Sequence, residues 1–335
     1  MDSPEKSPRI LIIRRDNIGD LVCTTPLIRS LRAQLPEAYI VALVTKYNLA
    51  VMAGNPDIDA LFSYTKAKHL EHGESRIGIF WSRLKTIWKL RKQRFDWILL
   101  PGGPQRSSLR FAKWIGAKKI LVRDAEDAAG GEHHVEQCCH QLVRMGLEFA
   151  SPEARLTPDK ARVTKFKHSL PREWNRHSGP VIALHLSSRK ISQRWPAERF
   201  AELARMLHEK LDAKLLLLWS PGSADNPLHP GDDEKARDVL TSTAGLPLHP
   251  VPTERLEDLI AALSLCDSMV CSDGGAMHLA AALGKPMVCL FGDSDPEHWG
   301  PWKVPYVVLH PPSREVTDIS VEQVSAAFLD LSQKS

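Results

Sequence analysis

Residues 268–292 constrain the fold of this 335-residue chain more than any other stretch. The apolar run at 268–271 is typical of a buried strand, and the polar and glycine residues at 273–275 then turn the chain. Apolar residues recur at helical spacing over 277–283, and a second apolar run at 287–291 predicts another buried strand. Strand, turn, helix and strand in this order predict a βαβ unit.

The turn of this unit has the composition of an anion site. Gly274 and Gly275 allow the backbone to approach a ligand closely, and the free N–H groups at the start of the following helix attract a phosphate. A second interpretation uses the same residues. Asp273 is then a plain N-cap, the glycines only make a tight turn, and His278 is an ordinary helix histidine. The residues alone do not separate the two.

Composition describes an ordinary globular chain with about two domains, since 43% of the residues are apolar and 25% are charged. The formal charge of +4 is too small to indicate a nucleic-acid partner, although it suits an acidic substrate or an anionic membrane surface. The six cysteines include no C-x-x-C pair, which favours buried reduced thiols. The polar first residues lack a signal-peptide core, and no apolar run is long enough to span a membrane. We therefore expect a cytoplasmic location.

Two series of alternating strands and helices predict an α/β fold made of two doubly wound, Rossmann-like parallel sheets. The first series begins with an apolar strand at 9–15, a loop at 16–20 and a helix at 21–35. The proline-rich stretch at 150–179 predicts a boundary, and the second series starts with a strand at 181–186. Two such halves form an interdomain cleft at the carboxyl ends of their strands.

Asp20 is the candidate catalytic base. It lies just beyond the carboxyl end of the first strand, where a cleft residue belongs, and a carboxylate there can take a proton from a bound hydroxyl. The alternative is that Asp20 only caps the helix that begins at Leu21. The loop has a single glycine, Gly19, which disfavours a dinucleotide site because that fingerprint needs three glycines.

Two motifs, one near each end of the chain, carry a resemblance to a known family. The segment 272–286 (SDGGAMHLAAALGKP), followed by Leu-Phe-Gly at 290–292 and Trp-Gly-Pro-Trp at 299–302, resembles the C-terminal signature of glycosyltransferase family 9. These are the bacterial ADP-heptose:lipopolysaccharide heptosyltransferases. The segment 15–26 (RDNIGDLVCTTP) is similar to the N-terminal motif of that family, whose Gly-Asp pair supplies the proposed catalytic base.

The resemblance implies the GT-B architecture and a division of labour between its domains. Residues 1–165 would form the acceptor-binding domain and 178–317 the nucleotide-sugar-binding domain, with a helix at 318–333 packing back on the first domain. The implied reaction moves a heptose from ADP-heptose to a lipopolysaccharide core acceptor with inversion. It uses Asp20 as the base, with Asn17 and Gly19 in the cleft loop, and needs neither a metal nor a cofactor.

The resemblance also implies a set of donor-binding residues. They follow the first strand of the second half, lie in a later loop, or belong to the glycine-rich turn: Ser187, Ser188, Gln193, Arg194, Glu234, Asp273, Gly274, Gly275, Ala276 and His278. Gln193 departs from the family, which has a phosphate-binding Lys there, so Arg194 or Lys190 would supply the charge. Without the resemblance, 187–196 reads as a charged surface loop.

Other functions stay open at this point. A D-x-D match at 293–295 lies between a strand and a proline and is interpreted as turn chemistry, so this match does not demand a divalent cation. A GT-B enzyme with another donor sugar, a nucleotide-sugar epimerase and a nucleotide-sugar-binding homologue without turnover remain alternatives.

The segment 76–94 has seven basic residues and no acidic one, with an apolar stripe at helical spacing: Phe80, Trp81, Leu84, Ile87 and Trp88. One interpretation is a helix that packs this stripe on the sheet and keeps its charges in water. The other is peripheral contact with an anionic acceptor or with the inner face of the inner membrane.

Overall fold

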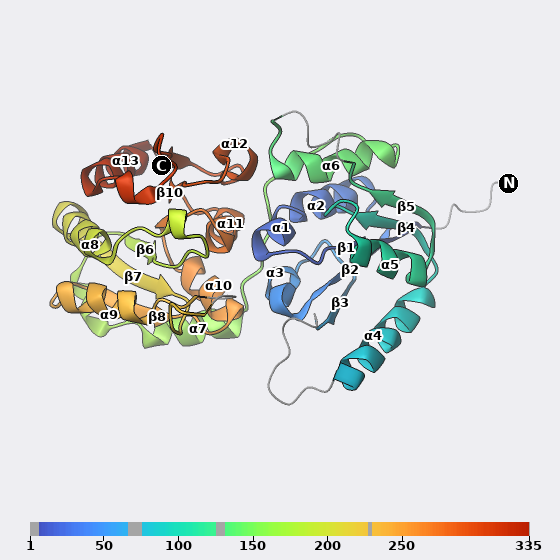
Figure 1. The fold of residues 1–335 in the computed structure, drawn as a ribbon, viewed down its shortest axis with the longest axis horizontal. Coiled ribbons are helices and arrows are strands. Elements are labelled where there is room, and N and C mark those ends of the chain that lie inside the picture. The colour runs from blue at the N-terminus through green and yellow to red at the C-terminus, as the bar shows by residue number, and fades with distance from the viewer. Residues whose placement is uncertain (1–6, 66–75, 125–130, 227–229, 335) are drawn as a thin grey trace. The chain divides into compact units, whose positions relative to one another are not determined.

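The structure is a computed structural model that describes residues 7–65, 76–124, 131–226 and 230–334. The chain forms two compact units, Met1–Thr157 and Pro158–Ser335 (Figure 1). The first boundary therefore falls earlier than the expected domain end at 165. Residues 158–165 belong to the second unit because α7 (Lys160–Ser169) packs on α10 (Leu256–Ser264).

The first unit is built on a parallel five-stranded sheet with the order β3-β2-β1-β4-β5. Its central strand β1 is buried on both faces, as its uninterrupted apolar sequence predicts, and Ile10 to Ile13 are at most 1% exposed. The strands are β1 (Arg9–Ile13), β2 (Tyr39–Thr45), β3 (Ala60–Tyr64), β4 (Phe95–Leu100) and β5 (Ala117–Val122).

Helices cover both faces of this sheet (Figure 1). Helices α4 (Arg76–Arg91) and α5 (Arg106–Ile115) share a core with Leu11 and Ile13 of β1, while α2 (Thr25–Gln34) packs with α6 (His134–Arg144). Alternate residues of β1 point to opposite faces, so one strand anchors both helix layers. Helix α3 (Leu49–Met52) and the 3₁₀ helix η1 (Lys46–Asn48) follow β2.

The single helix expected over 21–35 is wrong. The structure has α1 (Ile18–Val22) and then α2, with Pro26 in the first turn of α2. Pro26 has no N–H to donate to the carbonyl of Val22, which lies four residues earlier. The hydroxyl of Thr25 donates to that carbonyl instead, at 2.7 Å, and a new helix begins.

The second unit is a parallel six-stranded sheet with the order β11-β10-β9-β6-β7-β8. Its strands are β6 (Val181–His185), β7 (Lys214–Trp219), β8 (Leu248–Pro252), β9 (Ser268–Ser272), β10 (Met287–Leu290) and β11 (Tyr306–Leu309). Strand β8 was not predicted from the sequence because it contains Pro250 and Pro252. A strand with prolines is tolerated at a sheet edge, where one row of N–H groups has no partner strand.

The remaining helices of this unit are α8 (Ala197–Leu211), α9 (Asp233–Ser242), α11 (Gly275–Ala282), α12 (Pro296–Trp299) and α13 (Val321–Lys334), with 3₁₀ turns η3 (Arg172–Arg176), η4 (Ile191–Gln193) and η5 (Val316–Asp318). The α/β class with two Rossmann-like domains is confirmed. No helix in the described ranges is both long and apolar enough to cross a membrane.

The last helix corrects an expectation. The sequence analysis placed helix 318–333 against the N-terminal domain, but α13 packs on α8, β10 and β11 of its own unit. Its buried residues Val324 and Phe328 belong to the core that also holds Leu290. The apolar face of α13 is therefore used inside the second unit.

Candidate functional site

The predicted site residues, apart from Glu234 in α9, follow the strands at which each sheet reverses its order. In an open parallel sheet, ligands bind beyond the carboxyl ends of the strands at this switch point. In the first unit it lies between β1 and β4, and the loop after β1 contains Asn17, Gly19 and Asp20. In the second unit it lies between β6 and β9, and these strands are followed by 187–194 and 273–278.

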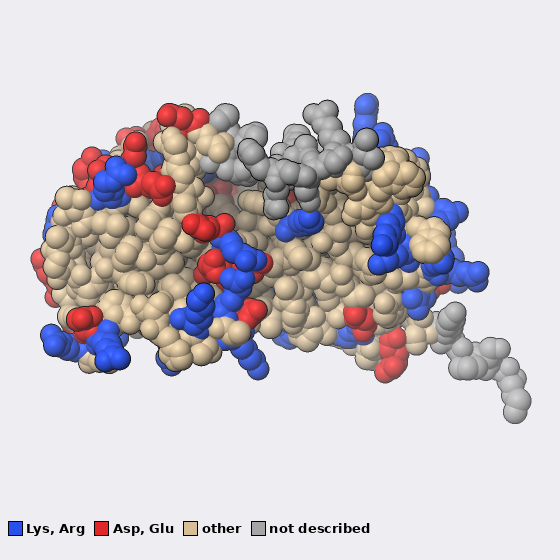
Figure 2. All heavy atoms as spheres, turned by 90° about the horizontal axis from the view of Figure 1, so that it is seen from below, with Lys and Arg blue, Asp and Glu red and all other residues tan. Residues whose placement is uncertain are grey.

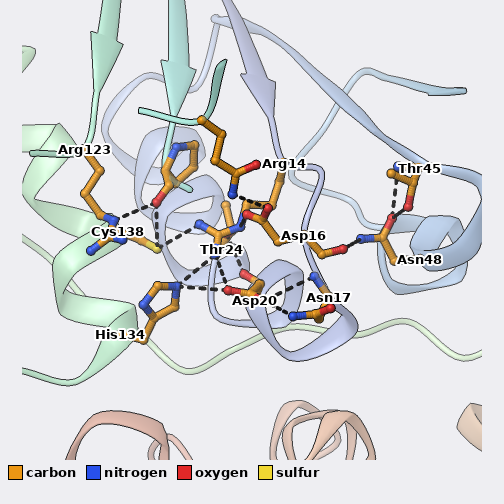
Figure 3. A network of polar contacts seen from close by, with 12 residues as sticks. Arg14, Asp16, Asn17, Asp20, Thr24, Thr45, Asn48, Arg123, His134 and Cys138 are labelled. Atoms are coloured by element: carbon orange, nitrogen blue, oxygen red, sulfur yellow. Dashed lines mark hydrogen bonds and ion pairs between the residues drawn. The ribbon is translucent and has the colours of Figure 1, made fainter. Parts of the chain in front are cut away.

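Asp20 lies inside α1, and the N-cap of this helix is the exposed Asn17. The Oδ2 atom of Asp20 accepts the backbone N–H of Asn17 at 3.2 Å and its side-chain Nδ2 at 3.1 Å (Figure 3). Asp20 is therefore the third residue of the helix and the reciprocal partner of the cap, so the alternative of an N-cap at Asp20 is wrong. Gly19 is buried within the same turn.

The other carboxylate oxygen of Asp20 contacts a buried cation. Nη2 of Arg14, at the end of β1, lies 2.6 Å from Oδ1 of Asp20, and Nε of Arg14 lies 3.0 Å from Oδ2 of Asp16. The Arg14 side chain is 1% exposed and that of Asp20 is 15% exposed. Because the guanidinium is fully withdrawn from water, its two carboxylate partners compensate its charge and it fixes where they point.

His134 at the start of α6 completes this cluster from a distant part of the chain. Its Nε2 lies 2.9 Å from Nη2 of Arg14 and 3.6 Å from Oδ1 of Asp20. A guanidinium only donates hydrogen bonds, so in its contact with Arg14 the Nε2 atom of His134 is the acceptor. Figure 3 shows Arg14, Asp20 and His134 pointing toward one another.

Arg14, Asp16 and His134 were not predicted from the sequence as site residues. Arg14 does carry a signal, because a charged residue at the end of a fully buried strand needs a partner. His134 carries none, since the fold alone brings it next to Asp20. Cys138 lies near Arg14 Nη1 at 3.9 Å, and burial raises the pKa of its thiol, so it stays protonated. All six cysteines are buried and unbridged, as predicted.

In the second unit Gln193 joins two predicted residues, Ser188 and Asp273, to Ser294, which was not predicted. Its Oε1 accepts the hydroxyl of Ser188 at 3.1 Å, while its Nε2 donates to Asp273 Oδ2 at 2.9 Å and to Ser294 Oγ at 2.8 Å. Lys190 donates to the same Ser294 oxygen at 3.2 Å. Gln193 is 3% exposed, so it ties the loop after β6 to the loop after β9.

The start of α11 is open. A Cβ at Gly274 would meet no atom within 4 Å, and Gly274 is exposed at the N-cap. Ala276 is 8% and His278 4% exposed, and the His278 ring packs edge-on against Trp299 with 6.2 Å between centroids. The free helix end is thus accessible to an anion, whereas the imidazole of His278 belongs to the packed interior.

A cavity of about 320 Å³ lies between the end of the loop after β6 and the start of α9. Among the described residues its lining includes two predicted ones, Arg194 and Glu234, and three that the sequence analysis missed, Trp195, Asp232 and Lys235. Nη2 of Arg194 and Oδ2 of Asp232 are buried without a hydrogen-bond partner in the described structure. Unsatisfied buried polar atoms of opposite charge are what a polar ligand would bind.

Lys235 adds a second cation to the cavity. Its Nζ donates to the carbonyl of Leu186 at 3.0 Å. Burial lowers the pKa of this ammonium to about 8, although the nearby carboxylate of Asp232 acts in the opposite direction. Its charge is therefore sensitive to mildly alkaline pH.

Two further residues of this region have structural partners. Oγ of Ser187 accepts the backbone N–H of Ser220 at 2.8 Å, which joins the ends of β6 and β7. A Cβ at Gly292 would lie 2.4 Å from the carbonyl oxygen of Ser192, so only glycine lets η4 approach the end of β10 this closely. The glycine of the Leu-Phe-Gly motif thereby sets the position of Gln193.

One member of the D-x-D match at 293–295 caps a helix, which agrees with its interpretation as turn chemistry. Asp295 is the N-cap of α12 and accepts the N–H of Glu297 at 2.9 Å. Within the described ranges, one trio offers donor atoms close enough for a metal ion: His177, His208 and Asp212. None of the predicted site residues belongs to it, and its carboxylate already accepts His177 Nδ1 at 2.7 Å.

Two Rossmann-like units with polar loops at both switch points have the architecture of a GT-B glycosyltransferase. The sequence profile of glycosyltransferase family 9 (heptosyltransferase) matches residues 83–324, and this chain belongs to that family. It is 25% identical to lipopolysaccharide heptosyltransferase 2 of Salmonella typhimurium, over 88% of this chain and 85% of the relative. It is 24% identical to lipopolysaccharide heptosyltransferase 3 of Escherichia coli, over 85% and 83%.

Solved structures share the fold across nearly the whole chain. A family 9 glycosyltransferase from Veillonella parvula superposes with a TM-score of 0.82 at 21% identity, covering 98% of both chains. An E. coli heptosyltransferase solved with ADP superposes with a TM-score of 0.74 at 18% identity, covering 96% of this chain and 99% of that one. The likeness confirms the GT-B fold.

Proposed function

We propose that this glycosyltransferase moves a heptose from ADP-heptose to a lipopolysaccharide core acceptor, with inversion, and that Asp20 is the general base. Relatives named as lipopolysaccharide heptosyltransferases support the substrates. A homologous fold that was solved with ADP-2-deoxy-2-fluoro heptose supports the donor.

The observation that carries the proposal is the way in which Asp20 is held. Arg14 and Asn17 orient both of its oxygens, and 15% of the side chain remains exposed. An acceptor hydroxyl can therefore reach a carboxylate that is already in position, which is how a general base is prepared for proton transfer. The hydroxyl gives its proton to Asp20, its oxygen bonds to the anomeric carbon, and the bond from that carbon to ADP breaks. Attack opposite to the leaving group inverts the configuration.

The second unit supplies the groups that a nucleotide diphosphate needs. Arg194 and Lys235 provide positive charge in the cavity, and the N–H groups of Gly275 and Ala276 lie at the open start of α11. Glu234 at the cavity wall would accept hydrogen bonds from the ribose hydroxyls. Asp273, oriented by Gln193, would contact the donor sugar. Arg194 would supply the positive charge at the phosphates that the family's Lys supplies at the position of Gln193.

The proposal needs no divalent cation at the diphosphate. Arg194, Lys235 and a helix N-terminus can together stabilise the leaving group. Asp295 of the D-x-D match at 293–295 caps α12, which supports the interpretation of this match as turn chemistry.

The class of acceptor also leads us to propose where the enzyme works. A lipopolysaccharide core grows on a lipid anchor, so the enzyme would work from the cytoplasm at the inner face of the inner membrane.

Transfer is tested with ADP-heptose and a delipidated lipopolysaccharide core fragment as the acceptor. The proposal expects ADP and an inverted glycoside in equal amounts, with the anomeric configuration assigned by NMR. Isomerised donor in the absence of acceptor would show an epimerase. Tight ADP binding without transfer to any core fragment would show a binding homologue. Thermal-shift measurements with ADP, UDP and GDP identify the base.

A further inference from the structure

The helix α4 presents its aromatic residues outward. Ile87 and Leu90 pack into the core of the first unit, at 7% and 0% exposure. Trp81 and Trp88 lie on the other side of the helix and are 65% and 57% exposed, and Phe80, in the first half of the helix, is 54% exposed. The interpretation that this stripe packs on the sheet is therefore wrong for all three rings.

A fourth ring comes from the neighbouring helix. Trp114 near the end of α5 is 46% exposed, and Arg91 of α4 donates to its carbonyl at 2.8 Å, which holds the two helix ends together. The exposed tryptophans of the described residues are these three alone: Trp81, Trp88 and Trp114. We call the surface formed by Phe80, Trp81, Trp88 and Trp114 the aromatic face.

Cations surround the aromatic face. No acidic residue occurs between 76 and 94 or between 106 and 119, whereas lysines and arginines recur through both segments. The Nζ atom of Lys92 lies 3.4 Å from the centroid of the Trp88 ring, and Cζ of Arg110 lies 5.9 Å from that of Trp114. Figure 2 shows Lys and Arg side chains gathered around uncharged ones on this unit, at the right of the view.

Lys85, Lys89 and Lys92 are all exposed, and in the described part of the chain none of them forms an ion pair with a carboxylate. Their charge is therefore available to an outside partner. A second copy of this face would bring lysine against lysine, and the core of a protein interface is depleted of lysine. A surface that combines exposed indole rings with uncompensated cations matches the headgroup layer of an anionic bilayer, where rings insert and cations meet phosphates.

We propose that the aromatic face binds an anionic phospholipid membrane, with Trp81 and Trp88 entering the headgroup layer and Lys85, Lys89 and Lys92 contacting lipid phosphates. This inference rests on the proposed function, which places the enzyme at a membrane and so favours a membrane over other polyanions. Beyond that function, it names the surface that binds the membrane and the lipids that this surface contacts.

The test is co-sedimentation of the full chain with phosphatidylcholine vesicles that contain or lack phosphatidylglycerol. Wild type binds the vesicles with phosphatidylglycerol, and the triple variant K85E, K89E, K92E loses at least about tenfold in partition coefficient. The matched control K160E, K165E, K167E makes the same charge change on the exposed side of α7 and keeps its binding. Equal losses in both triple variants would overturn the proposal, as would equal binding to vesicles without phosphatidylglycerol.

A second pair of variants tests the rings without changing charge. Trp81→Ser lowers the partition coefficient and reduces quenching of tryptophan fluorescence by brominated lipid. Tyr306→Ser, an exposed aromatic of the second unit at 45%, changes neither. A Trp81→Ser variant that binds like wild type overturns the inserted-ring geometry. RNA that competes fully with vesicles for wild type, and no longer binds the lysine variant, would assign the face to nucleic acid.

Transfer to the delipidated core fragment separates this inference from the proposed function. All four variants are expected to keep wild-type turnover with that acceptor, because none of their residues lies in the candidate site. Membrane binding without transfer would contradict the proposed function alone. Normal transfer without membrane binding would contradict this inference alone.

Discussion

The guanidinium of Arg14 lies 2.6 Å from the carboxylate of Asp20 while only 1% of the Arg14 side chain is exposed. The cation is fully buried and the anion keeps one edge in contact with solvent. This pair joins the end of the central strand to the first helical turn, and it holds the candidate base in a single orientation.

Replacing Arg14 with Met should therefore affect both stability and turnover. Loss of one partner of a buried ion pair costs about 3 kcal/mol of unfolding free energy, measured by urea denaturation. Turnover should fall by about tenfold or more because Asp20 loses its orientation, while ADP affinity stays unchanged. The surface pair Arg29–Glu153 provides the control, and Arg29→Met should cost less than about 1 kcal/mol.

Replacing Asp20 with Asn or Ala tests the base directly. Turnover should drop by about 10²–10⁴-fold, because neither side chain can take the hydroxyl proton. ADP affinity, measured by calorimetry, should remain close to wild type, since the ADP site is assigned to the second unit. Asn is the sharper replacement because it keeps the shape of the side chain beside Asn17. Near-normal turnover in either variant would remove Asp20 from the mechanism.

The lowered pKa of Lys235 predicts that ADP binds more weakly at alkaline pH. The pKa of Lys235 is lowered to about 8, chiefly by burial, so the cation is present below that pH and is lost as the pH rises through it. ADP affinity should therefore fall between about pH 7 and pH 9, and Lys235→Met should bind weakly with a flatter profile. Lys167→Met, an exposed change on α7, should retain the wild-type profile. A profile that is identical in wild type and Lys235→Met would contradict this role.

The contact between Gln193 and Asp273 predicts that replacing Gln193 weakens the binding of ADP-heptose more than the binding of ADP. Gln193→Leu removes the amide that donates to Asp273 and Ser294, and so leaves a carboxylate without its partner. Affinity for ADP-heptose should fall by about tenfold, and affinity for ADP by much less, because Asp273 is assigned to the sugar. Ile191→Ala, two residues away and 85% exposed, should change neither affinity. Equal losses for both ligands would assign Gln193 to the nucleotide instead.

Much of the fold was predictable because its signals are local. The apolar runs at 9–15 and 181–186 match β1 and β6 to within two residues, since buried parallel strands are uninterrupted in their hydrophobicity. The turn at 273–275 and the helix after it were also predictable, because glycine residues and apolar residues at helical spacing are local signals too. Local signals also produced the errors, because Pro250 and Pro252 hid an edge strand and the helical pattern over 21–35 concealed the break before Pro26.

The sequence by itself determined the α/β class, the two units, the glycine-rich start of α11 and the place of Asp20 after the first strand. These follow from hydrophobic period, glycine and proline, which act over a few neighbouring residues. Only the tertiary structure decided that His134 reaches Arg14, that Lys235 shares a cavity with Arg194, and that α13 packs in its own unit. Such contacts join residues that are far apart in the sequence. They depend on strand order and helix packing, and no local pattern specifies either of these.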